Sequence, residues 1–305
     1  MDRYVVALGM FDGVHLGHRA LLQRAAALAH ENGDCAVALT YETHPKELFT
    51  GSFRYLTDSH ERAALMRSVG IDRIDTVPFT KDFAAMSPEG FIDWLTARLE
   101  DRIFAIVCGY DYRFGAEAKG DGALLTALGQ SHGFDVEIID PVLYRGEACS
   151  STRVRQALTA GNIADANAML ARPYCVTGPV VHNRAIGRTM GFPTANIDAG
   201  KRLLPKEGVY ATALLYGGAC YAAVTNIGTN PTVGGKTVST ETFVPDESLD
   251  LYGKIVTVLF LERLRDEVRF ADTDALAAQI GTDAAKAKKV FKEAEKSVYK
   301  FARLW

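Results

Sequence analysis

The sequence has few cysteines, and no two of them form a Cys-x-x-Cys motif. An odd, dispersed set is typical of buried thiols in a reducing compartment and argues against a disulfide framework or a zinc site. The five cysteines are Cys35, Cys108, Cys149, Cys175 and Cys220.

Excess charge and long apolar runs are also lacking. Lys and Arg number 34 against 37 Asp and Glu, a net charge of −3, so no overall positive field attracts nucleic acid or an anionic membrane. No run reaches the roughly 18 apolar residues of a membrane span, and no charged stretch precedes an apolar run of signal-peptide length. We therefore expect a soluble, cytoplasmic protein without nucleic-acid or membrane partners. As a separate expectation, the chain is a monomer or a weak homo-oligomer.

Length and composition indicate a globular protein of two domains. The chain has 305 residues, of which 48% are hydrophobic and 23% charged, unlike a disordered or collagen-like chain. Roughly 150 residues per domain gives two domains. The pattern changes near residues 172–176, which predicts domains at 1–172 and 173–305.

Residues 1–172 alternate short apolar runs with helical patterns. Strands are expected at 5–8, 35–41, 74–78, 103–108 and 135–140, and helices at 18–30, 59–69, 88–99, 121–132, 153–158 and 163–170. This alternation predicts a doubly wound α/β domain with a parallel sheet. Ligands of such sheets usually lie beyond the carboxyl ends of the strands.

Residues 173–305 contain strand-like runs separated by Gly, Asn, Pro and Asp turns. The runs lie at 176–182, 208–216, 220–227, 237–244 and 254–261. Several strands at this spacing predict a small antiparallel barrel or sandwich. The tail, 273–305, has a helical pattern punctuated at Gly281.

Residues 9–18 (GMFDGVHLGH) join the first expected strand to the first expected helix. A helix N-terminus presents unpaired N–H groups and the positive end of the helix dipole, so it can hold phosphate. The three glycines permit a tight turn. His15 and His18 can point to one side and donate to phosphate oxygens, which would stabilise charge during displacement at phosphorus.

Other interpretations of this stretch exist. A glycine-rich turn with incidental histidines is one. A metal-binding pair is another, although it would need a third ligand that no nearby cluster supplies. A dinucleotide-binding fingerprint is excluded because G-x-G-x-x-G is absent.

The H-x-G-H signature resembles the nucleotidylyltransferase superfamily. Its longer form here, G-x-F-D-G-x-H-x-G-H, resembles the bacterial FAD synthetases, which are bifunctional riboflavin kinase/FMN adenylyltransferases. Further blocks follow in family order at His44-Pro45, residues 109–115 (GYDYRFG) and residues 150–155 (SSTRVR). Tyr41 and Thr43 replace the usual Phe and Pro of the family.

The resemblance implies roles for these residues. His15 and His18 would hold the ATP phosphates and act catalytically, and His44 and Asp111 would lie in the nucleotide or flavin pocket. The other implied ATP- and phosphate-binding positions are Gly9, Phe11, Asp12, Gly13, Gly17, Ser151, Thr152 and Arg155.

A second set of blocks resembles riboflavin kinases. They lie at residues 187–197 (GRTMGFPTANI), 208–211 (GVYA), 226–232 (NIGTNPT) and 240–242 (TET). The resemblance implies that Glu241 takes the proton of the primary hydroxyl of riboflavin. It also implies that Thr194 and Asn196 bind Mg²⁺ through oxygen, and that Gly187 and Arg188 bind ATP or ADP together with them.

Together the blocks imply a bifunctional enzyme of flavin synthesis. The barrel would phosphorylate riboflavin to FMN with ATP and Mg²⁺. The α/β domain would then join FMN to the AMP part of a second ATP, giving FAD and pyrophosphate.

Residues 183–186 (NRAI) and Phe243 depart from the kinase pattern, so a monofunctional FMN adenylyltransferase with a kinase-impaired barrel is an alternative. A non-catalytic flavin-binding protein is another, although it would need neither Glu241 nor the histidine pair.

Overall fold

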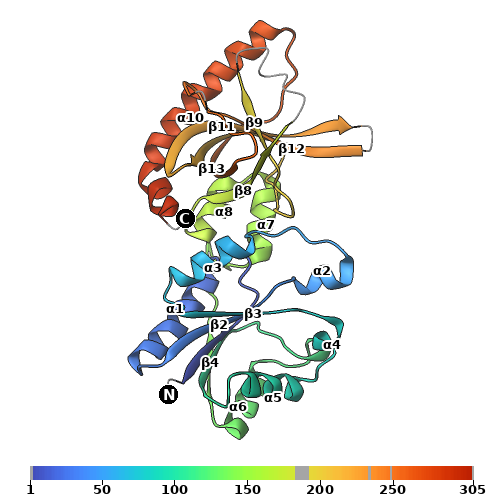
Figure 1. Ribbon diagram of the computed structural model, residues 1–305, viewed down its shortest axis with the longest axis vertical. Helices are drawn as coiled ribbons and strands as arrows, with labels where there is room; N and C mark the ends of the chain where they lie inside the picture. Colours follow the sequence, from blue (N-terminus) through green and yellow to red (C-terminus); the bar gives the residue numbers. More distant parts are fainter. Residues whose placement is uncertain (1–2, 183–191, 233–234, 248, 304–305) are drawn as a thin grey trace. The chain divides into compact units, whose positions relative to one another are not determined.

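The computed structural model describes residues 3–182, 192–232, 235–247 and 249–303. The chain forms two compact units, Met1–Ser151 and Thr152–Trp305, each with its own sheet (Figure 1). Helices α7 (Ser151–Ala160) and α8 (Ile163–Leu170) precede residue 172, and α8 packs on two strands of the barrel unit. The division of function at residue 172 stays a prediction. Among the helices that the structure describes, none is long and apolar enough to cross a membrane.

The first unit contains a five-stranded parallel sheet in the order β3-β2-β1-β4-β5. The strands are β1 (Tyr4–Leu8), β2 (Cys35–Tyr41), β3 (Arg73–Val77), β4 (Ile103–Gly109) and β5 (Asp135–Ile139). The main helices are α1 (Leu16–Glu31), α3 (Ser59–Arg67), α5 (Pro88–Arg98) and α6 (Gly122–His132). The predicted doubly wound α/β fold is confirmed.

Shorter elements in the connections were not predicted. They are α2 (Pro45–Thr50), α4 (Lys81–Ala84), the 3₁₀ helix η1 (Ala116–Ala118) and the two-stranded pair β6 (Leu143–Tyr144) and β7 (Glu147–Ala148). Each has only a few residues, too few to show a hydrophobic period.

The centre of the parallel sheet fixes where a ligand can enter. In β1, Val5, Val6 and Ala7 are fully buried, as expected for a central strand covered on both faces. The strand order reverses at β1, whose neighbours are β2 and β4. A crevice forms outside the carboxyl ends of the strands at such a reversal. The segments that follow β1 and β4 therefore lie at the carboxyl edge of the strands, where the sequence predicted ligand binding.

The second unit is a closed barrel in the order β10-β11-β12-β9-β8-β13, with antiparallel pairing throughout. The strands are β8 (Tyr174–Val181), β9 (Thr194–Ile197), β10 (Gly208–Tyr216), β11 (Ala219–Thr232), β12 (Gly235–Phe243) and β13 (Ile255–Arg265). The barrel rather than the sandwich is therefore correct. Strand β9 was not predicted, because its few residues follow a turn-like sequence.

Buried hydroxyl groups join neighbouring strands inside the barrel. Thr225 on β11 lies 2.9 Å from the hydroxyl of Thr212 on β10 and 2.9 Å from that of Thr242 on β12. All three residues are at most 1% exposed. Each hydroxyl both donates and accepts, so three threonines can satisfy one another where no water reaches them.

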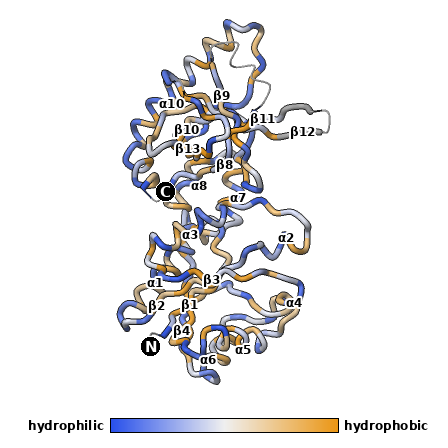
Figure 2. Tube along the Cα trace, in the orientation of Figure 1, coloured by the Kyte–Doolittle hydropathy of each residue, from blue (hydrophilic) through white to orange (hydrophobic). Residues whose placement is uncertain are grey.

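Helix α10 (Thr273–Ala302) covers the outer face of β10, β11 and β13 (Figure 1). Ala284 and Ala287 pack against Val209 and Val224, and hydropathy alternates along the helix (Figure 2). The helix continues through Gly281, where the sequence indicated a break. A Cβ at Gly281 would meet no atom within 4 Å, so this glycine serves no close approach.

Candidate functional site

The turn between β1 and α1 has a strained backbone. Phe11, Gly13 and Val14 have positive φ angles of 52°, 87° and 39°. This region suits glycine but is unfavourable for a β-branched residue such as Val14, whose side chain is fully buried. Such strain persists only where the surrounding packing enforces it, and it clusters at functional sites.

Asp12 ties this turn to the segment that precedes α3. Its buried carboxylate accepts the N–H groups of Leu56 and Thr57, both at 3.0 Å, and the hydroxyl of Thr57 at 3.1 Å. The Thr57 hydroxyl oxygen in turn accepts the N–H of Gly13 at 3.1 Å. Sequence reasoning missed Thr57, because a single threonine ahead of a helix belongs to no motif.

Arg62 on α3 also supports the turn and was missed. It is 3% exposed, and it donates to the carbonyl oxygens of Tyr41 at 2.9 Å and Met10 at 3.4 Å. Burial lowers the pKa of this guanidinium from its ordinary value, and the charge of Asp12 opposes that effect. An arginine in a helical pattern is normally exposed, so no sequence pattern indicated this role.

His15 and His18 come together as predicted. Their rings stack with centroids 3.7 Å apart and planes at 22°. His15 is the N-cap of α1, and its Nδ1 accepts the N–H of His18 at 3.4 Å. With Nδ1 as the acceptor, a neutral His15 ring carries its proton on Nε2, which can then donate.

Two glycines and one aromatic ring shape the surroundings of the histidine pair. A Cβ at Gly17 would lie 3.2 Å from the His15 ring, and one at Gly9 would lie 2.9 Å from the Phe11 ring. Phe11 meets His18 edge-on, with centroids 5.4 Å apart. The glycines therefore permit the close packing that holds these rings.

Ser151 of the Ser-Ser-Thr block contacts the same turn. Its hydroxyl donates to the backbone oxygen of Asp12 at 2.7 Å, at the point where α7 begins. Thr152 and Arg155 lie on α7 in the second compact unit. Their part in the phosphate site stays a prediction.

His44, in the loop after β2, is the N-cap of α2. Its Nδ1 accepts the N–H of Lys46 at 3.1 Å, and its ring stacks on Phe53 at 3.8 Å. The backbone N–H of His44 donates to the Tyr55 hydroxyl, and that hydroxyl donates to the carboxylate of Glu47 at 2.5 Å. Burial and this bond to Glu47 raise the pKa of Tyr55 to about 12.

Asp111 lies just beyond the carboxyl end of β4, at the edge where ligands bind in such sheets. A Cβ at Gly109 would lie 3.3 Å from Asp111 Oδ1. Burial, with the charge of Asp111, raises the pKa of the Cys108 thiol to about 11. Cys108 is also fully buried, so its thiol is shielded from solvent.

The strand pairing of the barrel assembles the second set of residues. Asn196 on β9 lies directly opposite Glu241 on β12, and Thr194 lies opposite Phe243. Residues two apart in a strand point to the same face, so Thr194, Asn196 and Glu241 share one face. Asn196 is 9% exposed, so the amide beside Glu241 is largely shielded from water.

A pocket of about 570 Å³ opens at the start of β9. Thr194 lines it, together with Tyr252 and the acidic residues Glu247 and Asp250. The Tyr252 ring stacks on His182 with centroids 4.1 Å apart. The predicted nucleotide positions Gly187 and Arg188, and the variant loop 183–186, lie outside the described residues.

The donor set of the barrel fits a hard cation. Thr194 offers a hydroxyl oxygen and Asn196 an amide oxygen, and Mg²⁺ is usually held by a few protein oxygens together with substrate phosphates. Among the described residues, no group of three His, Cys, Asp or Glu side chains could hold a metal ion by itself.

Comparison with known proteins covers both halves of the chain. An FAD synthetase family model matches residues 1–153, and a riboflavin kinase family model matches residues 170–291. The bifunctional riboflavin kinase/FMN adenylyltransferase of Escherichia coli strain K12 is 38% identical over 291 residues, which cover 94% of this chain and 92% of that protein. The protein of the same description from Listeria monocytogenes is 34% identical, covering 92% and 90%.

A solved structure also matches nearly the whole chain. It is described as a macrolide-efflux protein from Streptococcus pneumoniae and aligns with a TM-score of 0.86, at 31% identity, over 94% of both chains. The curated relatives favour the bifunctional interpretation over a monofunctional enzyme or a flavin-binding protein. The chain belongs to the bifunctional riboflavin kinase/FMN adenylyltransferase family, whose members convert riboflavin to FMN and FMN to FAD.

Proposed function

We propose that the two reactions have separate sites, with adenylylation at the turn after β1 and phosphorylation on the face of β9 and β12. One observation carries this proposal: the predicted residues form two sets, a stacked His15/His18 pair in one compact unit and an opposed Asn196/Glu241 pair in the other. Each set suits a different displacement at phosphorus.

In the adenylylation reaction, a phosphate oxygen of FMN attacks the α-phosphorus of ATP. An O–P bond forms, and the bond from the α-phosphorus to the oxygen of pyrophosphate breaks. His15, His18 and the N–H groups at the start of α1 hold the charge that builds on the departing pyrophosphate. Asp12 fixes the turn through Thr57, and Gly9, Phe11, Gly13 and Gly17 shape it.

Other residues complete the adenylylation site. Ser151, Thr152 and Arg155 would contact phosphate, since hydroxyl groups and a guanidinium near a helix start suit that ligand. His44 and Asp111 would contact the nucleotide or the flavin from the loops after β2 and β4.

In the phosphorylation reaction, Glu241 takes the proton of the primary hydroxyl of riboflavin, and the hydroxyl oxygen attacks the γ-phosphorus of ATP as ADP leaves. Thr194 and Asn196 would hold Mg²⁺, which when bound neutralises phosphate charge. Gly187 and Arg188 would contact the nucleotide. The cytoplasmic location and the monomeric or weakly oligomeric state expected from the sequence stay predictions.

Two substitutions, one in each proposed site, test whether the sites are separate when both reactions are assayed in each variant. His15→Ala should lower FAD formation from FMN and ATP by about 10²–10³-fold, the usual loss for one charge-stabilising donor, and leave FMN formation intact. Glu241→Ala should lower FMN formation from riboflavin and ATP by about 10²–10⁴-fold and leave FAD formation from FMN intact. Chromatography of the flavin products measures both reactions.

The exposed Glu262 on β13 provides a matched control. Glu262→Ala should leave both reactions unchanged. Loss of both activities in either His15→Ala or Glu241→Ala, with the fold intact by circular dichroism, would contradict separate sites.

A further inference from the structure

The residue opposite the proposed base of the barrel also contacts a second carboxylate. Glu267 follows β13, and its Oε1 accepts a hydrogen bond from Asn226 Nδ2 at 2.8 Å. Asn226 lies on β11 directly opposite Glu241 on β12. Opposed side chains of an antiparallel pair have Cβ atoms about 5 Å apart. Asn226 therefore neighbours both carboxylates.

The Glu267 carboxylate determines how the amide of Asn226 faces. A carboxylate only accepts hydrogen bonds, so the NH₂ end must face Glu267 and Oδ1 must face away. Oδ1 is buried, and no residue in the described ranges donates to it. A buried acceptor without a donor is rare in folded proteins. Oδ1 is thus suited to accept a hydrogen bond from a bound molecule.

Two features hold Glu267 against β11. Gly228 leaves room for the carboxylate, because a Cβ there would overlap with Glu267 Oε1. Arg265 donates from Nε and Nη2 to Oδ2 of Asp283 at 2.9 and 2.8 Å. Asp283 lies on α10 and is 1% exposed, so this ion pair fixes the end of β13 just ahead of Glu267.

We propose that Glu267 is a positioning residue of the kinase reaction, which orients Asn226 so that Oδ1 accepts a hydrogen bond from a hydroxyl of the ribityl chain of riboflavin. The proposal rests on the proposed role of Glu241. Riboflavin carries further hydroxyls beside the primary one that is phosphorylated. Asn226 holds one of them while Glu241 acts on the primary hydroxyl, so the pair Asn226–Glu267 contributes to riboflavin binding rather than to ATP binding.

Steady-state kinetics of full-length variants test this proposal. Glu267→Ala and Asn226→Ala should each raise the KM for riboflavin about 3- to 10-fold, as expected for one neutral hydrogen bond, with the KM for ATP unchanged. Glu267→Gln keeps an oxygen that accepts from Asn226, so its KM should stay within about twofold of the parent. Glu262→Ala, at an exposed position on β13, is the matched control, and FMN adenylylation in each preparation reports intact protein.

A double variant separates action through Asn226 from an independent effect. Glu267→Ala combined with Asn226→Ala should match Asn226→Ala alone. Additive effects, an unchanged KM for riboflavin in Glu267→Ala, a raised KM for ATP instead, or a Glu267→Gln variant as impaired as Glu267→Ala would each overturn the proposal. Full kinase activity in Glu241→Ala would overturn the base assignment without altering these KM values, so the two failures are distinguishable.

Discussion

The two units assemble polar side chains in different ways. In the α/β unit, the histidine pair comes from one continuous stretch, and a strained turn with Val14 in a left-handed conformation presents it. In the barrel, Asn196, Glu241 and Asn226 come from three strands, and only the pairing register places them in a row. The first arrangement depends on local backbone geometry, and the second depends on the whole sheet.

This difference predicts how each unit responds to mutation. A change that loosens the turn should impair adenylylation and leave the barrel folded. A change inside the barrel should destabilise that unit and leave the turn intact. Three predictions follow, from the largest expected effect to the smallest: the first two test that independence, and the third concerns the α/β unit alone.

Asp12→Ala should cause the largest change in stability. It leaves the N–H groups of Leu56 and Thr57 without their buried acceptor, which costs about 3 kcal/mol. The thermal transition of the α/β unit should fall and FAD formation should be lost, while riboflavin phosphorylation continues. Asp135→Ala, at an exposed position on β5, is the control and should change neither. Equal loss of phosphorylation in Asp12→Ala would argue that the units do not behave independently.

Thr225→Val should have a smaller effect, confined to the barrel. It keeps the shape of the side chain but removes the middle hydroxyl between Thr212 and Thr242. Leaving buried hydroxyl groups without partners costs about 1–2 kcal/mol. Urea unfolding, monitored through the loss of kinase activity, measures this decrease in the stability of the barrel. The same substitution at Thr282, which is exposed on α10, should have little effect, and a destabilised α/β unit in Thr225→Val would be the contrary result.

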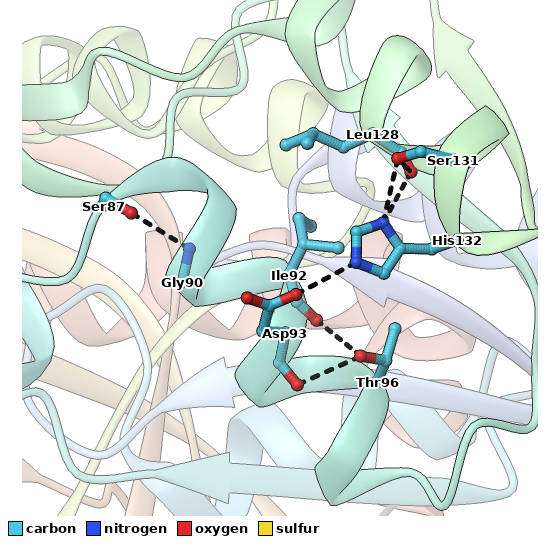
Figure 3. A network of polar contacts seen from close by, with 8 residues as sticks. All are labelled: Ser87, Gly90, Ile92, Asp93, Thr96, Leu128, Ser131 and His132. Carbon is cyan, nitrogen blue, oxygen red and sulfur yellow. Dashed lines mark hydrogen bonds and ion pairs between the residues drawn. The ribbon is translucent and has the colours of Figure 1, made fainter.

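The smallest effect concerns the pH dependence of the α/β unit. His132 at the end of α6 contacts Asp93 on α5 through Nε2 at 3.0 Å and the Leu128 oxygen through Nδ1 at 2.9 Å (Figure 3). Both partners accept, so they favour the protonated ring, and the hydrogen bond to Asp93, followed by that to Leu128, raises the pKa of His132. The ion pair with Asp93 is largely exposed, so it contributes only about 0.5 kcal/mol.

The sign of this effect follows from the raised pKa. The stabilisation is fully present below the unfolded pKa of about 6.5 and is lost as the pH rises through the folded pKa of His132. Denaturant titrations of the parent and of His132→Gln across this range should therefore give free energies of unfolding that converge at high pH. A difference that grows with pH would contradict this assignment.

The same contrast explains what the sequence could predict. The histidine pair was found because residues 9–18 are contiguous and follow a buried strand. The parallel sheet was found because its strands and helices are long enough to show their periods. Glu241, Thr194 and Asn196 were assigned only through resemblance to riboflavin kinases, because their residue types carry no signal without the register that pairs them.

Other features could not be read from local patterns. Thr57 and Arg62 act through the tertiary contact between the β1–α1 turn and the α3 region. Asn226 and Glu267 meet only because β11 and the end of β13 approach over Gly228. Such contacts depend on which backbone segments approach each other, which neither hydrophobic period nor turn chemistry specifies.

Closure of the barrel has a consequence for how the kinase face could evolve. The end of β12 that carries Glu241 is paired on both sides, with β11 and, over residues 241–243, with β9, so this part of the strand has no free edge. A slip of one position would turn Glu241 into the interior, where Thr242 now meets Thr225. Insertions and deletions within residues 241–243 should therefore be excluded, and natural length variation should lie outside this segment, as in the connections between strands.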